Sequence, residues 1–231
     1  MKRLGIIFMH YRDDPVTRFH FDLVKKLHPD DLLVPVSGGD YGIPGSIMLK
    51  QLPGEMGDLW RRVTHRGTSV PAWRHVDVGY YAAWDACRED IERWVFLEWD
   101  IRCNMSVRDF FAPNWDDQIV CADVRRTDDW WWGMEADRLP EVLRPHACGC
   151  VICTCMMLTD EALFRVVEAF MGLPFFNTFC ELRLGTLASY AGCQPTKLSR
   201  VAGAISPDPL GPEVDLSRPG LFHAVKNLAR K

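Results

Sequence analysis

The stretch from Arg93 to Cys103, RWVFLEWDIRC, indicates more about the fold than any other part of the chain. Its first half is a continuous apolar run of the kind found in strands that are buried on both faces. The run ends on two acids, Glu98 and Asp100, with Trp99 between them. Acids are poor strand formers and are costly to bury without a partner. A strand that ends in this way favours a site, although the spacing alone also fits a solvated strand end with two exposed acids.

Strand and helix patterns alternate along the rest of the chain. Apolar runs predict strands at about residues 4–11, 31–40, 93–101, 149–158 and 193–199, and another within residues 115–124. Helical spacing predicts helices at about residues 14–28, 76–92, 159–172 and 177–192. Residues 42–75 are rich in Gly and Pro, and we expect them to be irregular. This alternation predicts an α/β fold with a mostly parallel central sheet flanked by helices, in which ligands bind at the carboxyl ends of the strands.

The composition excludes several classes of protein. The 231 residues are 48% hydrophobic and 25% charged, which is ordinary for a globular protein and argues against disorder. The formal net charge of -4 gives no basic field of the kind that nucleic-acid binding requires. No apolar run is long enough to span a bilayer, and we interpret the start, MKRLGIIFMHYRDD, as a first strand rather than a signal peptide. We therefore expect a cytoplasmic protein with no transmembrane segment.

Nine cysteines without a secretory signal indicate free thiols in a reducing compartment. Four of them lie close together in HACGCVICTC. On one strand, Cys148 and Cys150 would face one side and Cys153 and Cys155 the other, so they could not surround a single zinc ion. We interpret them as small buried apolar residues. A zinc–thiolate site in Cys148–Cys155 stays open as an alternative.

The two acids after the apolar run suit a divalent cation. In an extended chain, Glu98 and Asp100 would point the same way and Trp99 would point to the other face. Two carboxylates at such a short distance repel each other unless a cation lies between them or one of them keeps its proton. Oxygen ligands suit Mg²⁺ or Mn²⁺, which commonly bind one or two carboxylates together with substrate phosphates.

The segment VFLEWDI, preceded by an amphipathic helix, resembles the D-x-D region of glycosyltransferases with the GT-A fold. The order of elements is similar too: a first strand, the acid motif near the middle, CVICTCMMLTDEALFRVVEAF after it, a later helix with an acid, and a final GLFHAVK. The resemblance implies a single GT-A-like, Rossmann-related domain over residues 1–231. Residues 1–102 would form the nucleotide-binding half, and residues 103–231 the acceptor-binding half and the C-terminal tail.

The resemblance also implies a metal site for Mn²⁺ or Mg²⁺. Asp100 would be the principal ligand and His223 a late ligand, while Glu98 would contact the metal through water or bind the donor ribose. Lys226 would be left to approach a phosphate. The first motif residue is Glu rather than Asp and the middle one is the bulky Trp99, so which acid binds the metal directly stays open.

Glu181, in the helix NTFCELRLGTLASYAG, is the implied general base that deprotonates an acceptor hydroxyl. A helix-surface acid that could pair with Arg183 or its neighbours is the alternative interpretation. Loops at the strand ends and the start of the helix before the acid motif would hold the nucleotide, through His10, Tyr11, Arg12, Asp40, Arg74 and Asp77. Ordinary loop polarity, and helix capping by Asp77, explain these residues equally well.

The acceptor site is expected in DDWWWGMEAD, from Asp128 to Asp137. If this segment is a strand, Trp131 opposes Trp130 and Trp132, so at least one indole is exposed or lies at a cleft. Sugar rings pack on indole, and Glu135 or Asp137 could bind hydroxyls. A second hydrophobic cluster or an oligomer contact is the alternative.

The sequence therefore predicts a metal-dependent, hexosyltransferase-like glycosyltransferase. It would move a sugar from a nucleotide-sugar donor, UDP- or GDP-linked, to a carbohydrate or other hydroxyl acceptor. One alternative is a nucleotidyltransferase that acts on a sugar phosphate, against which MHYRDDPVT lacks a Gly-rich loop. Another is a non-catalytic domain that binds a nucleotide or carbohydrate. The donor sugar, the anomeric outcome and the oligomeric state stay open.

Overall fold

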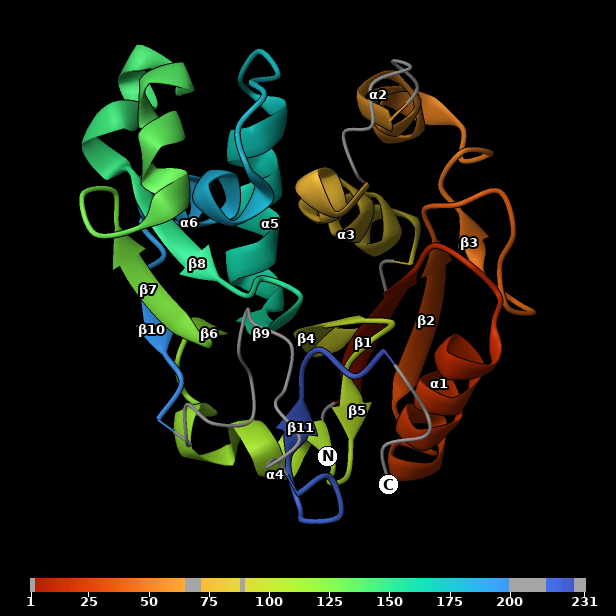
Figure 1. Cartoon of the computed structure of the whole chain (residues 1–231). Coiled ribbons are helices and arrows are strands. Elements are labelled where there is room, and N and C mark those ends of the chain that lie inside the picture. The colour runs from red at the N-terminus through yellow and green to blue at the C-terminus, as the bar shows by residue number, and fades with distance from the viewer. Residues whose placement is uncertain (1–2, 65–71, 88–89, 200–214, 227–231) are drawn as a thin grey trace.

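The computed structural model of the protein describes residues 3–64, 72–87, 90–199 and 215–226. A seven-stranded sheet runs through its middle in the order β10-β6-β9-β4-β1-β2-β3 (Figure 1). Its strands are β1 (Arg3–His10), β2 (Leu32–Ser37), β3 (Ile47–Met48), β4 (Ile91–Glu98), β6 (Ile119–Cys121), β9 (Cys155–Thr159) and β10 (Pro195–Lys197). The α-helices are α1 (Pro15–Leu27), α2 (Gly54–Thr64), α3 (Val76–Ala86), α4 (Val107–Phe111), α5 (Asp160–Met171) and α6 (Cys180–Tyr190).

The predicted α/β fold with a mostly parallel, helix-flanked sheet is confirmed. Strand β1 pairs in parallel with β2 and β4, β2 pairs in parallel with β3, and β10 does so with β6. Only β9 runs the other way, antiparallel to both β4 and β6. The register sets Met9 beside Glu98, so the ends of β1 and β4 lie at the same edge of the sheet.

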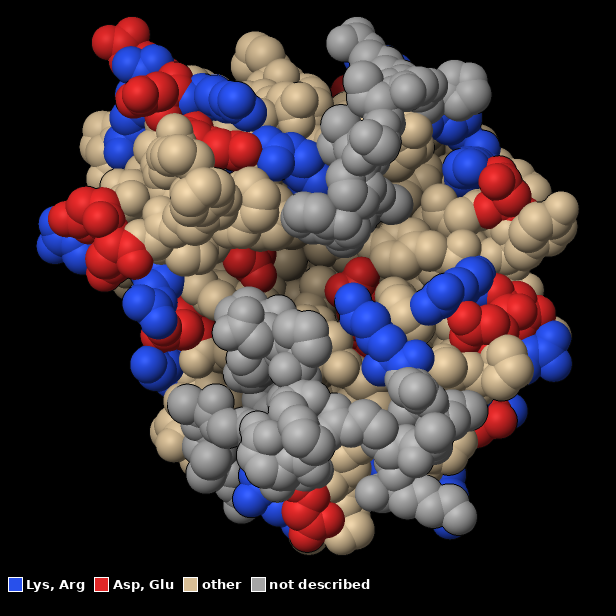
Figure 2. All heavy atoms as spheres, viewed as in Figure 1, with Lys and Arg blue, Asp and Glu red and all other residues tan. Residues whose placement is uncertain are grey.

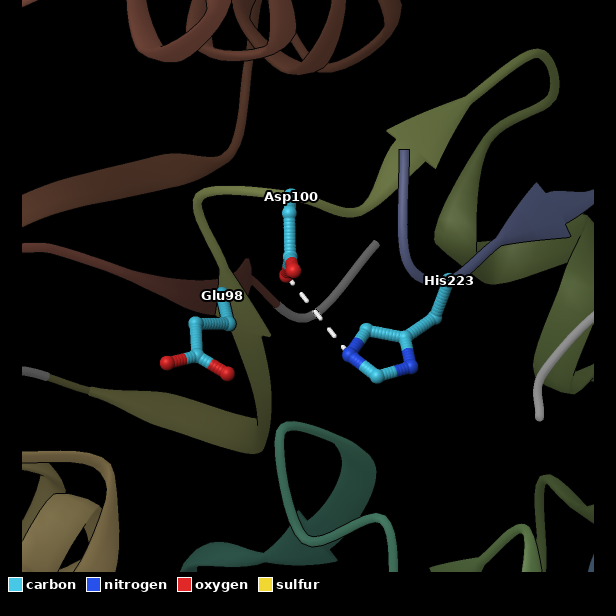
Figure 3. A group of neighbouring side chains, drawn as sticks. All are labelled: Glu98, Asp100 and His223. Carbon is cyan, nitrogen blue, oxygen red and sulfur yellow. Dashed lines mark ion pairs between the residues drawn. The ribbon is translucent and has the colours of Figure 1, made fainter. Parts of the chain in front are cut away.

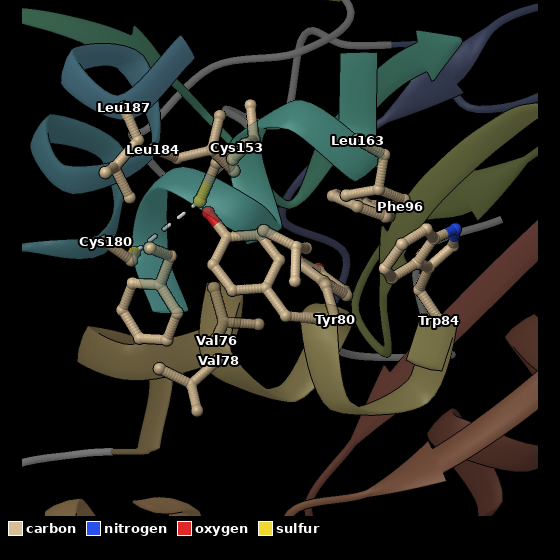
Figure 4. Packing of buried hydrophobic residues seen from close by; sticks show 14 of the residues in the cluster. Val76, Val78, Tyr80, Trp84, Phe96, Cys153, Leu163, Cys180, Leu184 and Leu187 are labelled. Atoms are coloured by element: carbon tan, nitrogen blue, oxygen red, sulfur yellow. Dashed lines mark hydrogen bonds between the residues drawn. The ribbon is translucent and has the colours of Figure 1, made fainter. Parts of the chain in front are cut away.

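Strand β4 is apolar throughout because both of its faces are covered. Trp94 and Phe96 belong to the hydrophobic cluster on one side of the sheet, and Val95 and Leu97 to the cluster on the other side. On the first side, Tyr80 of α3 stacks on Phe96 with 4.1 Å between the ring centroids (Figure 4). A strand buried on both faces reads as a continuous hydrophobic run rather than an alternating one.

Small sheets and 3-10 turns complete the architecture. Strand β5 (Arg102–Cys103) pairs antiparallel with β11 (Leu221–Phe222), and β7 (Asp123–Arg126) pairs antiparallel with β8 (Cys148–Val151). The 3-10 turns are η1 (Ala72–His75), η2 (Ala112–Asn114), η3 (Trp131–Arg138) and η4 (Glu141–His146). The β5–β11 pair lies below the end of β4 and brings the C-terminal segment there (Figure 1).

Side-chain caps fix the starts of two helices. Asp14 caps α1 by accepting a hydrogen bond from the backbone N–H of Thr17 at 2.8 Å, with Pro15 at the first helical position. The Thr159 side chain caps α5 by accepting from the N–H of Ala162 at 3.1 Å. Helix α3 ends at Ala86, earlier than the expected end near residue 92, because β4 already begins at residue 91.

The expectation of irregular structure over residues 42–75 is wrong for Gly54–Thr64, and its residues 65–71 lie outside the described part of the chain. Helix α2 occupies Gly54–Thr64 and packs against α3. Met56, Leu59 and Trp60 are buried, at the i, i+3, i+4 spacing of one helix face. The glycines and prolines of the segment obscured this pattern, although Gly54, with φ of +84°, stands at the first helical position.

The single strand expected over residues 149–158 is also wrong. The segment forms two strands, β8 and β9, which belong to different sheets and are joined by a turn at residues 152–154. The four cysteines therefore do not share one strand. All nine cysteines of the chain are free thiols, as expected. Among the described residues, no helix is both long and apolar enough to cross a membrane.

Candidate active site

A cavity of about 590 Å³ opens at the carboxyl end of β4. Figure 2 shows a hollow near the middle of one face of the molecule, with acidic residues at its edge. Both halves of the chain contribute to its wall. The lining residues are Tyr11, Arg12, Glu98, Trp99, Asp100, Trp132, Ile152, Cys153, Thr154, Phe179, Cys180, Glu181, His223 and Lys226.

Three potential metal ligands converge on this cavity. Glu98, Asp100 and His223 each offer a ligand atom, and the three atoms lie within 4.8 Å of one another. Figure 3 shows them arriving from the end of β4, from the turn after it and from the segment after β11. Over the described ranges, this is the one such cluster of three or more His, Cys, Asp or Glu side chains. The Cys148–Cys155 segment therefore supplies no zinc site there.

Asp100 is buried with one carboxylate oxygen left unsatisfied. Its side chain is 4% exposed, and its Oδ1 has no hydrogen-bond partner. The Nε2 of His223 lies 3.6 Å from this Oδ1, and the Nζ of Lys226 lies 3.5 Å from Oδ2. Buried polar atoms are nearly always hydrogen-bonded, so an orphaned carboxylate oxygen beside an imidazole and a second acid is the arrangement that a cation would complete.

The backbone holds this arrangement in place. The N–H of Val225 donates to the main-chain carbonyl of Asp100 at 2.7 Å, which ties the C-terminal segment to the acid motif. In the turn itself, the N–H of Ile101 donates to the carbonyl of Glu98 at 3.0 Å. These main-chain bonds fix the backbone that carries the two acids.

The surroundings of Glu98 disfavour the charged form of its carboxyl group. Burial raises its pKa to about 8, the charge of Asp100 adds to the rise, and Lys226 lowers it. The hydroxyl of Tyr11 lies close by, and burial followed by the charge of Glu98 raises the pKa of that tyrosine well above its usual value. A divalent cation at the cluster would favour the charged form of Glu98.

The expectation that Trp99 faces away from the acids is wrong. Strand β4 ends at Glu98, and residues 99–100 form a turn, so the two-residue alternation of a strand does not apply. Trp99 lines the same cavity as the acids. The guanidinium of Arg12 lies 4.2 Å from the centroid of the indole, and the ammonium of Lys226 lies 6.0 Å from it.

Glu181 also reaches the cavity, from the first turn of α6. Its carboxylate accepts hydrogen bonds from the backbone N–H groups of Ile152 and Cys153. Burial nevertheless raises its pKa to about 8, against the lowering effect of these two bonds. Ile152 holds its N–H there with φ of +57°, a region that β-branched residues rarely adopt. The alternative that Glu181 pairs with Arg183 is wrong, because Arg183 pairs with Asp77.

Asp77 and Arg74 do not line the cavity. Asp77 and Arg183 form a fully buried ion pair, in which Nε lies 2.7 Å from Oδ2. The side chain of Asp77 therefore neither caps its helix nor faces a donor site. Arg74 pairs with Glu135 at 2.5 Å and lies 5.8 Å from the ring of Trp132.

The residues expected at the ends of β1 and β2 divide into two groups. Tyr11 and Arg12 line the cavity. His10 is fully buried beside it and bonds to the hydroxyl of Ser46 at 2.9 Å. Asp40 is largely exposed, and it pairs with Lys50 at 2.6 Å.

The tryptophan-rich segment is the 3-10 turn η3 and not a strand, so its three indoles do not alternate across a sheet. Trp132 lines the cavity and stacks on Phe179 with 4.2 Å between ring centroids. Trp131 is 70% exposed, and Trp130 packs over Gly149. Glu135 is buried, where it accepts from the N–H of Phe179 at 2.7 Å and supports the cavity wall from behind.

Sequence reasoning did not identify the turn at residues 152–154 or Phe179 and Cys180 as parts of the wall. The turn was hidden inside an apolar run that resembled one strand. Phe179 is the N-cap of α6 and Cys180 its first residue, so their position at a helix start beside Glu181 was the available signal.

Comparison with known proteins adds little to these observations. No protein-family model matches the sequence, and no curated protein matches it. Among solved structures, the chain is similar to the galactosyltransferase LgtC, solved in complex with donor and acceptor sugar analogs. The TM-score is 0.40 and the identity 10%, over 82% of this chain and 72% of that one. At this level the similarity assigns no activity.

Proposed function

We propose that the chain is a metal-dependent glycosyltransferase, which moves a sugar from a nucleotide-diphosphate donor to a hydroxyl acceptor. One observation carries the proposal: a buried carboxylate oxygen of Asp100 without a partner, beside Glu98 and His223, in a cavity at the carboxyl end of β4. Open α/β sheets bind their ligands at this edge. The residue pattern that resembles the D-x-D region of GT-A glycosyltransferases supplies the substrate class.

Mn²⁺ or Mg²⁺ fits the donor set. Asp100 and His223 would hold the ion directly, with Glu98 as a further ligand or a partner through water. The imidazole favours Mn²⁺, which accepts a nitrogen ligand among oxygens. Once bound, the ion would neutralise charge on the departing nucleoside diphosphate.

The cationic side of the cavity suits the phosphates of the donor. Arg12 and Lys226 both lie near the face of Trp99, and both line the cavity. Arg12 is held by Asp14 at 2.7 Å, so its guanidinium is oriented before a ligand arrives. Tyr11 completes this wall and would contact the nucleoside, either uridine or guanosine.

The opposite wall suits the acceptor. The stacked pair of Trp132 and Phe179 presents an aromatic edge on which the apolar face of a sugar can pack. Glu181 would take the proton of the attacking hydroxyl. Its pKa of about 8 leaves it largely protonated at pH 7, so the rate should rise with pH towards about 8.

The test measures binding of UDP and of GDP by calorimetry, with and without Mn²⁺. We expect one nucleotide to bind, and to bind more tightly with Mn²⁺. Asp100→Asn should weaken Mn²⁺ binding by more than about 100-fold, because the loss of an outer-shell partner alone costs about 10- to 100-fold. Asp40→Asn, which changes an exposed acid outside the cavity, is the matched control.

Two outcomes would contradict the proposal. If neither nucleotide binds with Mn²⁺ present, the chain is not a nucleotide-sugar transferase. If a nucleotide binds but no sugar is released from any UDP- or GDP-sugar, even to water, the chain is a binding domain and not an enzyme.

A further inference from the structure

We infer that Lys226 couples the binding of the divalent cation to the binding of a diphosphate. It opposes binding of the divalent cation alone and favours binding of the cation together with a diphosphate. The inference rests on the proposed function, because it assumes the cation site at Asp100. It concerns how tightly that site holds a cation before a nucleotide arrives.

The first observation is that Lys226 and the cation share one carboxylate. The Nζ of Lys226 lies 3.5 Å from Oδ2 of Asp100, and the other oxygen, Oδ1, faces His223. Asp100 is 4% exposed, whereas the side chain of Lys226 is 64% exposed. The ammonium therefore supplies the positive charge at a carboxylate that solvent barely reaches.

A divalent cation at Asp100 would face this ammonium at close range. Like charges a few ångströms apart repel, and the repulsion is larger beside a buried carboxylate than in bulk water. Binding of the cation alone therefore requires the ammonium to move away or to tolerate the repulsion. Either requirement weakens the affinity for a bare cation.

The second observation shows where the ammonium can go. The N–H of Val225 is bonded to the carbonyl of Asp100, so the backbone before Lys226 is anchored while its long side chain is free to turn. Trp99 offers its face 6.0 Å from Nζ, and Arg12 already lies 4.2 Å from the same ring. A cation above an aromatic ring is stabilised by the ring's quadrupole.

A diphosphate reverses the effect of the Lys226 ammonium on binding of the cation, from unfavourable to favourable. It brings several negative charges to the space between the cation cluster and Trp99, and a lysine ammonium binds phosphate well as a point charge. Lys226 then gains a partner that replaces Asp100. The ammonium that opposes the cation alone therefore favours the cation–diphosphate pair, which makes the two ligands bind cooperatively.

Arg12 does not perform the same role, because it is paired with Asp14 at 2.7 Å, and within the described residues no ion pair joins it to Glu98 or Asp100. Its guanidinium lies 4.2 Å from the centroid of the Trp99 ring. Lys226 is thus the residue whose removal separates the two effects.

The experiment titrates Mn²⁺ into the full chain and follows free Mn²⁺ by electron paramagnetic resonance, with and without UDP and GDP. Lys226→Met should bind Mn²⁺ alone about 5- to 50-fold more tightly than the unsubstituted protein, a typical range for coupling between two ligands. The tightening of Mn²⁺ binding by the nucleotide should fall by a similar factor. Lys226→Arg keeps the charge and should keep most of the coupling.

Lys197→Met is the matched control. Lys197 is 58% exposed and pairs with Asp123 at 2.9 Å, so it is a surface lysine with a carboxylate partner, and it does not line the cavity. This variant should bind Mn²⁺ as the unsubstituted protein does. Circular dichroism checks that every variant is folded.

The outcomes separate the inference from the function. If the nucleotide tightens Mn²⁺ binding and Lys226→Met leaves both affinities unchanged, or weakens binding of Mn²⁺ alone, the inference is wrong and the proposed function stands. If neither the unsubstituted protein nor Lys226→Met binds Mn²⁺ under any condition, the proposed metal site fails and the inference fails with it.

Discussion

The buried ion pair between Asp77 and Arg183 provides the sharpest test of how the fold is held around the cavity. The guanidinium of Arg183 on α6 contacts the carboxylate of Asp77 on α3 through two bonds, of 2.7 and 2.5 Å, and both side chains are 0% exposed. Arg183 also donates to the carbonyl of Thr178 at 2.6 Å, in the segment before α6. The change Arg183→Met keeps an unbranched side chain and removes its charge and its hydrogen-bond donors.

The expected cost is large because the change leaves a charge without a partner. Removing one member of a buried pair typically destabilises a protein by about 3–5 kcal/mol, since the remaining ion stays desolvated. Native proteins are stable by only about 5–15 kcal/mol. For a chain of this size the loss corresponds to a fall in Tm of roughly 6–20 °C. The double variant Asp77→Leu with Arg183→Met removes both charges and should cost less than the sum of the two single changes.

Urea denaturation, followed by tryptophan fluorescence and circular dichroism, measures these free energies of unfolding. Arg165→Met is the control, because Arg165 forms an exposed pair with Glu161 on the surface of α5 and should cost less than about 0.5 kcal/mol. A cost below about 1 kcal/mol for Arg183→Met would refute the reasoning. So would a double variant whose cost equals the sum of the single ones.

Two further predictions concern Glu181 and the packing of α6. Folding raises the pKa of Glu181 from 4.5 to about 8. Between these pH values the folded protein therefore holds a proton that the unfolded chain has released. The free energy of unfolding should fall as the pH rises through this window. Glu181→Gln should make that fall smaller, as measured by urea denaturation at pH 5 and pH 8.5; an unchanged slope would contradict the pKa. Gly185→Ala would place a Cβ 2.5 Å from the carbonyl oxygen of Cys148, and we expect a loss of about 1–3 kcal/mol. Gly172→Ala, where the nearest atom is 3.2 Å away, is the control, and equal losses for the two would show that the contact of α6 with β8 is not tight.

The central sheet could be predicted because its strands are marked by short apolar runs in the sequence. The run before Glu98 is apolar on both faces, and the structure covers both faces of β4 with separate hydrophobic clusters. The errors arose where local patterns were ambiguous. Helix α2 has a proper apolar face at Met56, Leu59 and Trp60, but the surrounding glycines and prolines suggested a loop. The turn that begins at Ile152 depends on a positive φ, which the sequence did not signal.

The candidate site was predictable only in part, for a related reason. Residues that follow a strand or open a helix, such as Arg12, Asp100 and Glu181, could be placed by their position in an element, and they do line the cavity. The partner of Asp77 could not be found in this way, because Arg183 lies 106 positions further along the chain. An acid at a helix start looks the same in the sequence whether it faces a ligand or a buried guanidinium.

The burial of Asp100 explains why the site needs its C-terminal segment. A carboxylate that is 4% exposed is costly to keep charged without positive charge nearby, and both groups that form ion pairs with it, on His223 and Lys226, come from the segment after β11. The pairing of β11 with β5 and the bond from Val225 to Asp100 bring that segment into place. The acids at the end of β4 and in the turn after it therefore depend on residues more than a hundred positions away, because that distant segment brings Lys226 and His223 beside Asp100.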